Sequence, residues 1–176
     1  FIKINALMKD AYLNGKTGPT RKMVQSLSAL VDSSKDIKIS KAILTYLEAY
    51  FQDQEDNVSA LKFSKRLFVL SKDGVDTEGM IRSLKSIFYN LSLLGQYDKI
   101  ANLVEDSEVE KYLSKSDLLV YKVYTKSIKK LNKEVISEYE KGIEGFIGSP
   151  SASLLFNVAE AYFREGNLRR PSQLSP

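Results

Sequence analysis

Apolar residues recur along the chain at intervals of three and four, which is the spacing of one face of an α-helix. No clear run of alternating apolar and polar residues interrupts this pattern. The prolines lie at positions 19, 150, 171 and 176, so the stretch from 20 to 149 contains none. Glycines mostly follow the end of an apolar-periodic segment, where helices commonly stop. The pattern predicts an all-α fold of helices joined by short turns.

The predicted helices come in pairs. We expect them at 1–14 and 20–32, 39–53 and 57–71, 78–94 and 96–106, and 116–131 and 133–146, with a further helix at 151–165. The first helices of the pairs end near Lys16, Gln54, Gly95, Asn132 and Gly166, a spacing of about 34 to 41 residues. A helix pair repeated at this spacing is typical of an α-solenoid. The sequence therefore predicts a right-handed α-solenoid of about four and a half antiparallel helix pairs.

The sequence Glu-Ala-Tyr-Phe occurs at 48–51 and again at 160–163, 112 residues later. Both copies fall at the end of a predicted first helix, where a large aromatic side chain can pack against the next helix. We therefore expect Tyr50 and Tyr162 to occupy equivalent buried positions. A helical bundle without repeats, in which the two copies coincide by chance, is the alternative.

The last copy resembles the tetratricopeptide repeat, whose first helix carries a small residue, a tyrosine and a turn glycine at fixed offsets. Ala159 lies three residues before Tyr162, and Gly166 lies four residues after it. Leu155 and Val158 also match, and the matches at 42–63 are Ile43, Tyr46, Tyr50, Ser59 and Phe63, whereas Leu47 and Gln54 depart from the pattern. The resemblance implies a helix-packing role for Tyr46, Tyr50, Gly95, Ala159, Tyr162 and Gly166.

The pentatricopeptide repeat, a related helix pair that binds RNA, is the weaker resemblance. Its base-reading position would place Asn, Thr or Ser ten residues before the turn glycine. Counting back from Gly95 and Gly166 gives Lys85 and Phe156, and neither residue fits.

Composition argues against catalysis. The 176 residues include no cysteine, histidine or tryptophan, so disulfides, thiolate chemistry and the commonest general base are all absent. We expect no catalytic residue, no cofactor and no metal site. The formal net charge of +4 favours acidic partners slightly. We expect one domain at 1–168, a segment of a longer chain, and a truncated or non-native tail at 169–176.

Five lysines form the most organised polar feature. On a helix, Lys122, Lys126, Lys129, Lys130 and Lys133 gather within roughly one third of the circumference, opposite Tyr124, Ile128 and Leu131. They are interpreted either as a solvated outer face or as a cationic stripe for an acidic peptide, an acidic subunit or a phosphate backbone. Further along, the resemblance would place Asn157 in a concave groove that holds a peptide backbone, with Arg164 two turns on. A simple exposed asparagine is the alternative.

The sequence thus predicts a non-catalytic scaffold that mediates protein–protein interaction within a larger assembly. An RNA-binding helical repeat that uses the lysine stripe is the alternative. We expect a protein or peptide partner, with nucleic acid less favoured, no membrane insertion, and a cytoplasmic rather than mitochondrial location. Homo- or hetero-oligomers are also expected, because the apolar residues of the last helix need cover: Leu154, Leu155, Val158, Ala159 and Tyr162.

Overall fold

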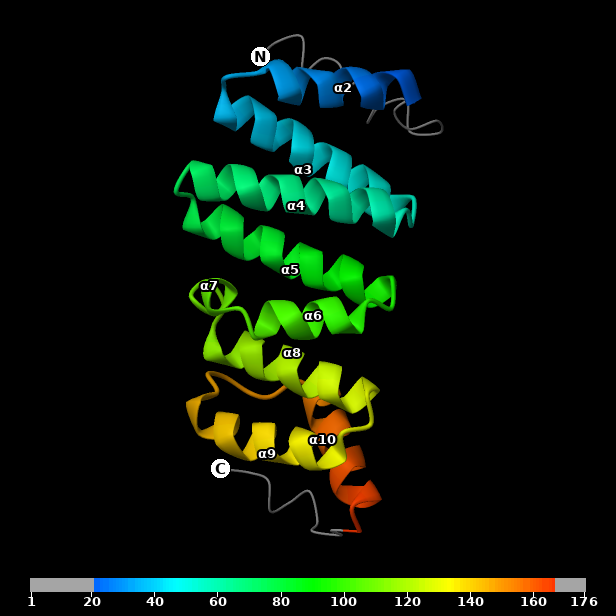
Figure 1. Ribbon diagram of the computed structural model, residues 1–176, viewed down its shortest axis with the longest axis vertical. Helices are drawn as coiled ribbons and strands as arrows, with labels where there is room; N and C mark the ends of the chain where they lie inside the picture. Colours follow the sequence, from blue (N-terminus) through cyan, green and yellow to red (C-terminus); the bar gives the residue numbers. More distant parts are fainter. Residues whose placement is uncertain (1–20, 167–176) are drawn as a thin grey trace. The chain divides into compact units, whose positions relative to one another are not determined.

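The computed structural model describes residues 21–166, which are all-α and contain no strand (Figure 1). The helices are α2 (Arg21–Ser33), α3 (Ile37–Asp53), α4 (Asn57–Asp73), α5 (Thr77–Leu93), α6 (Tyr97–Val104), α7 (Ser107–Glu110), α8 (Lys115–Ile128), α9 (Asn132–Gly142) and α10 (Ala152–Arg164), with a 3₁₀ turn η1 (Ile143–Gly145). The all-α prediction is confirmed. The helix predicted at 1–14 and the tail at 169–176 lie outside the described residues.

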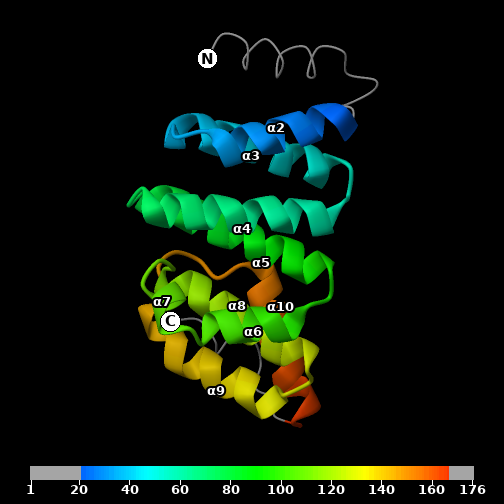
Figure 2. The same ribbon diagram turned by 45° about the horizontal axis from the view of Figure 1, so that its top comes forward.

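The chain divides into two compact units, Phe1–Leu94 and Gly95–Pro176. In the first unit each helix packs on the next, α2 on α3, α3 on α4 and α4 on α5. In the second unit α6 packs on α8, and α10 packs on both α8 and α9 (Figure 2). This packing of sequential neighbours is the arrangement of an α-solenoid. Two predictions depend on how the two units are related: that the solenoid is right-handed and that residues 1–168 form a single domain. Both stay predictions.

Three aspartates set the starts of the helices in the first unit. Helices α3, α4 and α5 each have 17 residues, and each follows an aspartate whose carboxylate accepts hydrogen bonds from main-chain N–H groups of the first turn. These aspartates, Asp36, Asp56 and Asp76, recur every 20 residues. Such caps satisfy donors that a helix start otherwise leaves unbonded. The first helices of the pairs begin at Ile37, Thr77, Lys115 and Ala152, spacings of 40, 38 and 37 residues, whereas a tetratricopeptide unit has about 34.

The turns after these helices share one conformation. The residue after the helix C-cap has a positive φ of 53–72° at Glu55, Val75, Gly95, Lys130 and Gly166. Glycine adopts this left-handed conformation freely, whereas a side chain with a Cβ is strained there. The turns expected at Gly95 and Gly166 are confirmed. The helix expected at 116–131 ends earlier, at Ile128, because the left-handed Lys130 cannot continue it.

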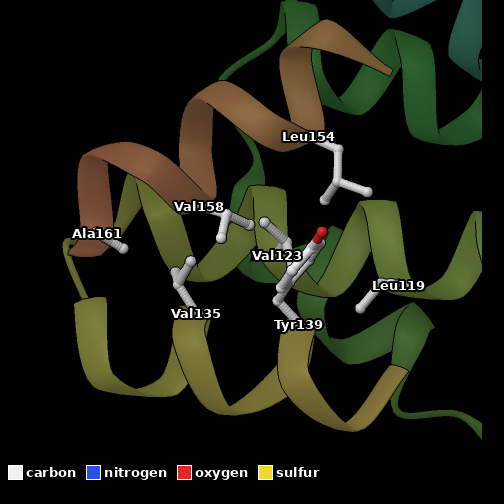
Figure 3. Close-up of a cluster of buried hydrophobic side chains, with 7 residues drawn as sticks. All are labelled: Leu119, Val123, Val135, Tyr139, Leu154, Val158 and Ala161. Carbon is white, nitrogen blue, oxygen red and sulfur yellow. The ribbon is translucent and has the colours of Figure 1, made fainter. Parts of the chain in front are cut away.

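Each unit has its own apolar core. In the first unit one cluster of buried side chains comes from α2, α3 and α4, and the ring of Phe51 stacks on that of Phe63 at a centroid distance of 5.5 Å. Helix α5 of the same unit also buries apolar side chains, among them Leu84, Phe88 and Leu91. In the second unit one cluster of buried side chains comes from α8, α9 and α10 and converges between these helices (Figure 3): Leu119, Val123, Val135, Tyr139, Leu154, Val158 and Ala161. Burial of these side chains is the main force that holds the helices of each unit together.

The two Glu-Ala-Tyr-Phe copies end their helices in the same way but face different surroundings. Tyr50 and Tyr162 are both half-buried. Phe51 packs against the first core, whereas Phe163 is 71% exposed. The apolar residues of α10 that were expected to need a covering partner differ in their burial. Leu154 and Val158 already lie in the second core, whereas Leu155 is exposed.

Candidate protein-binding groove

A small pocket lies between α6 and α8, within the second unit. Its volume is about 110 Å³, and its apolar lining comes from Ala101, Val104 and Leu131. The polar lining residues are Glu105, Lys122, Thr125, Lys126 and Lys129. Sites for cofactors and drug-sized ligands are commonly about 300–1,000 Å³. The pocket therefore suits one apolar side chain of a partner better than a whole small molecule.

Two tyrosines hold the walls of this pocket together. The ring of Tyr97 at the start of α6 meets that of Tyr124 in α8 edge to face, with centroids 6.0 Å apart. Such aromatic pairs contribute about 0.5–1.5 kcal/mol beyond the area they bury. Burial raises the pKa of Tyr124, and the neighbouring Tyr97 raises it further. The hydroxyl of Tyr124 therefore stays neutral at physiological pH, and the two rings stabilise the contact between α6 and α8 by packing.

Helical spacing brings three of the predicted lysines to this pocket. Lys122 and Lys126 are one turn apart on α8, and Lys129 is the C-cap of the helix. Cations are favoured at this end of a helix because the main-chain carbonyl groups there carry a partial negative charge. The structure places Lys130 and Lys133 elsewhere: Lys130 lies in the turn after α8, Lys133 lies in α9, and both are exposed outside the pocket lining. The five lysines therefore do not share one helix face.

The three pocket lysines differ in their charge partners. Lys126 forms an ion pair with Glu138 of α9, and both side chains are half-buried. The Nζ atom of Lys129 lies 2.5 Å from Oδ1 of the exposed Asp98. Exposed pairs of this kind contribute little to stability and exchange readily with other charges. Lys122 is half-buried and has no ion-pair partner among the described residues. Lys122 is therefore the cation best placed to receive a carboxylate from outside.

Asn157 and Arg164 make contacts within the second unit. The side-chain oxygen of Asn157 accepts a hydrogen bond from the hydroxyl of Ser127 at 3.3 Å, which ties α10 to α8. Arg164 Nη2 lies 2.6 Å from Glu160 Oε1, one turn earlier in α10. Neither residue lines the α6–α8 pocket. Contact of Asn157 and Arg164 with a peptide stays a prediction.

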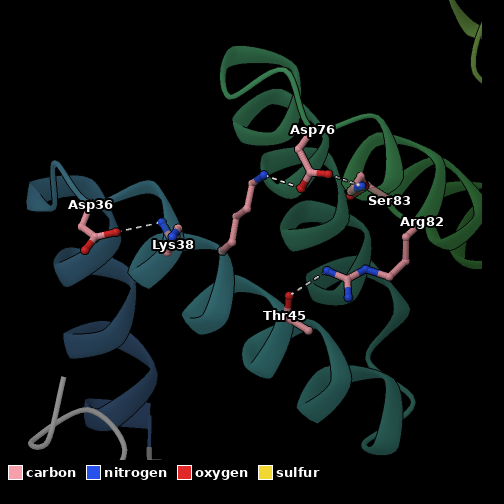
Figure 4. Close-up of polar contacts among 8 residues, drawn as sticks. Asp36, Lys38, Thr45, Asp76, Arg82 and Ser83 are labelled. Carbon is pink, nitrogen blue, oxygen red and sulfur yellow. Dashed lines mark hydrogen bonds and ion pairs between the residues drawn. The ribbon is translucent and has the colours of Figure 1, made fainter.

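A row of polar contacts between α3 and α5 is absent from the sequence-based candidates. Arg82 donates a hydrogen bond to Thr45 Oγ1 at 3.3 Å (Figure 4), and Gln52 donates one to Ser86 Oγ at 3.1 Å. Lys41 Nζ lies 2.6 Å from Asp76 Oδ2. These partners are 34 to 37 residues apart in the chain. The row fixes the register of α3 against α5. In the sequence, its signal is that each polar residue is followed by another about one helix pair later.

Two classes of site find no support in the described part of the chain. No helix between residues 21 and 166 is long and apolar enough to cross a membrane. Across the same residues, no cluster of three or more Asp, Glu, His or Cys side chains could hold a metal ion. Comparison of the chain with protein-family models, curated proteins and solved structures gave no match.

Proposed function

We propose that this protein is a non-catalytic helical-repeat scaffold of the tetratricopeptide-like kind that binds an acidic segment of a protein partner. The observation that carries the proposal is the α6–α8 pocket, in which apolar walls stand beside Lys122, Lys126 and Lys129. An apolar side chain of the partner would enter the pocket. A neighbouring carboxylate would pair with Lys122, and a second carboxylate would compete with Asp98 for Lys129.

Charge and shape support a peptide over a bare polyanion. Binding to a phosphate backbone gains free energy when unpaired lysine or arginine side chains neutralise phosphates and release the counterions condensed on the nucleic acid. Two of the three pocket lysines already face carboxylates, which reduces the positive charge on this surface. An apolar pocket adds nothing to the binding of a phosphate backbone, whereas it adds hydrophobic burial to the binding of a peptide. The geometry therefore favours a segment in which acidic and apolar residues alternate.

The test is fluorescence anisotropy with a labelled peptide that repeats Glu-Glu-Leu, compared with peptides that repeat Glu-Glu-Ser and Lys-Lys-Leu. We expect only the first to bind well, and we expect added salt to weaken it. Replacing Lys122, Lys126 and Lys129 with Gln should lower the affinity about tenfold or more, since bonds to charged groups contribute about 1.5–3 kcal/mol.

The matched control is the double replacement of Lys130 and Lys133 with Gln. It removes charge from the same stretch of chain without touching the pocket lining, so peptide affinity should change little. Equal losses in the two variants would indicate a general cationic surface instead of a pocket. Tighter binding of single-stranded RNA than of the peptide would favour the RNA-binding alternative.

A further inference from the structure

Helix α10 is apolar on two opposite faces. One face carries Leu154, Val158 and Ala161, which are buried against α8 and α9 (Figure 3). The opposite face, called here the outer face of α10, consists of Ala152, Phe156, Ala159 and Phe163. Phe156 is 68% exposed and Phe163 is 71% exposed. Large exposed aromatic rings on one helix face commonly mark a surface that another element covers.

The Glu-Ala-Tyr-Phe copy in α3 shows how the equivalent helix face is packed there. Aligning the two copies places Ser40, Leu44, Leu47 and Phe51 of α3 at the positions of the outer face of α10. In α3 the first three are at most 2% exposed, and Phe51 stacks on Phe63 of the following helix, α4. Leu44 and Leu47 lie in one core cluster with side chains of α2 and α4, so the neighbouring helices cover this face in α3. No described helix covers it in α10.

The small and large residues of the outer face are arranged symmetrically about the middle of α10. Ala152 and Phe163 are equally far from a point between residues 157 and 158, and so are Phe156 and Ala159. If two α10 helices pack antiparallel about a two-fold axis through that point, each phenylalanine meets an alanine of the second copy. A self-complementary patch of this kind is what a symmetric dimer requires.

We propose that the outer face of α10 binds the outer face of α10 in a second copy of this chain, forming an antiparallel two-fold dimer. Large side chains then fill the space left by small ones, as in packed helix pairs. Glu160 lies opposite Leu155 of the second copy, so no like charges meet. Tight complexes commonly bury about 800 Å² on each partner, and one helix face offers less. The dimer is therefore a weak one that dissociates on dilution through the micromolar range.

The experiment is sedimentation velocity over a dilution series of the full chain and its variants. The wild type should shift from dimer to monomer, whereas Phe156→Asp and Phe163→Asp should stay monomeric with unchanged helical circular dichroism. Val69→Asp is the matched control, since Val69 is 57% exposed on α4 and its replacement should leave the dimer intact. A wild type that stays monomeric at every concentration overturns the proposal, and so does a dimer that both aspartate variants retain.

A size swap then tests the antiparallel pairing. Phe163→Ala leaves a gap against Ala152 of the second copy, and Ala152→Phe crowds Phe163 of the second copy, so each single variant should weaken the dimer about tenfold or more. Both residues are exposed, so folding should be unaffected. The double variant exchanges large for small and should restore the wild-type affinity. If Ala152→Phe instead strengthens association, the contact is unspecific and the proposed pairing is wrong.

Discussion

Lys41 of α3 and Asp76 at the start of α5 form an ion pair, with 2.6 Å between Nζ and Oδ2. The same carboxylate accepts a hydrogen bond from the main-chain N–H of Gly79 at 2.9 Å and so caps α5. The side chain of Asp76 therefore caps the start of α5 and also links α5 to α3. A Cβ at Gly79 would lie 2.4 Å from Asp76 Oδ2, so a larger residue there would displace the capping carboxylate.

The first prediction concerns acid stability. The hydrogen bond from Lys41, followed by that from Gly79, lowers the pKa of Asp76 below its ordinary 3.8. A lowered folded-state pKa contributes stability above the unfolded-state value, and this stability is lost as the pH falls through the folded-state value. Asp76→Asn should therefore lower the melting temperature at pH 7, and its difference from the wild type should shrink below about pH 3.8.

The control for that variant is Asp36→Asn, measured by the same thermal unfolding series. Asp36 caps α3 in the same way but has no lysine partner among the described residues. Its variant should show a smaller change at pH 7. Parallel acid profiles for wild type and Asp76→Asn would show that the ion pair does not contribute.

The second prediction concerns the left-handed turn residues. Val75 has a φ of 53° and is 84% exposed, so its side chain contributes strain and little packing. Val75→Gly should raise the free energy of unfolding by about 1 kcal/mol, because glycine adopts this conformation without a Cβ clash. Gly95→Ala, at a φ of 65°, should lower it by a similar amount. Urea unfolding measures both changes.

Val69→Gly is the control for the turn prediction. Val69 is exposed within α4, where glycine is less favourable than valine because it loses more backbone freedom on folding. The two valine variants should therefore change stability in opposite directions. A loss of stability in both would contradict the strain at Val75.

The third prediction concerns a buried hydroxyl. Tyr139 is 2% exposed in the second core, and its hydroxyl has no hydrogen-bond partner among the described residues (Figure 3). An unsatisfied buried polar group costs about 1–3 kcal/mol. Tyr139→Phe should therefore stabilise the protein by about 1 kcal/mol or more. Tyr162→Phe, which removes a 2.7 Å hydrogen bond to Glu140, should leave stability unchanged or lower it by up to about 1 kcal/mol. Denaturant unfolding of the Tyr139→Phe and Tyr162→Phe variants measures both changes in stability.

The fourth prediction concerns alkaline stability. Burial, with a smaller contribution from Asp117, raises the pKa of Tyr121 to about 12. A raised folded-state pKa gives stability that is complete below the unfolded value near 10 and is lost as the pH rises toward 12. The wild type should lose stability over this range more steeply than Tyr121→Phe. Phenolate absorbance should show Tyr121 titrating late, and titration near pH 10 would contradict its burial.

Local signals in the sequence predicted the helices well, because apolar periodicity and turn residues act over a few positions. Every helix predicted between 20 and 165 has a counterpart in the structure, whereas the short α7 was missed because four residues are too few to show a period. Val75 was missed because the adjacent Gly74, with a φ of −87°, appeared to be the turn residue. The structure shows that the left-handed position is one residue later.

The candidate site was less predictable, because it depends on contacts between helices. Lys122, Lys126 and Lys129 were predicted from helical spacing, and they line one pocket. Lys130 was included because the helix was expected to run to residue 131, and Lys133 because the same helical spacing was applied across the turn that follows. The carboxylates of Glu138 and Asp98, which pair with two of the lysines, come from neighbouring helices. No pattern within one helix could have identified them.

The most direct test of the central claim is methyl NMR of the full chain during titration with the Glu-Glu-Leu peptide. Binding of its leucine in the α6–α8 pocket predicts saturable shifts at Ala101, Val104 and Leu131, which line the pocket. Leu154 and Val158 of the second core should keep their positions, and Lys122→Gln should weaken the shifts. Binding without shifts at the pocket methyl groups, or with larger shifts elsewhere, would contradict the claim.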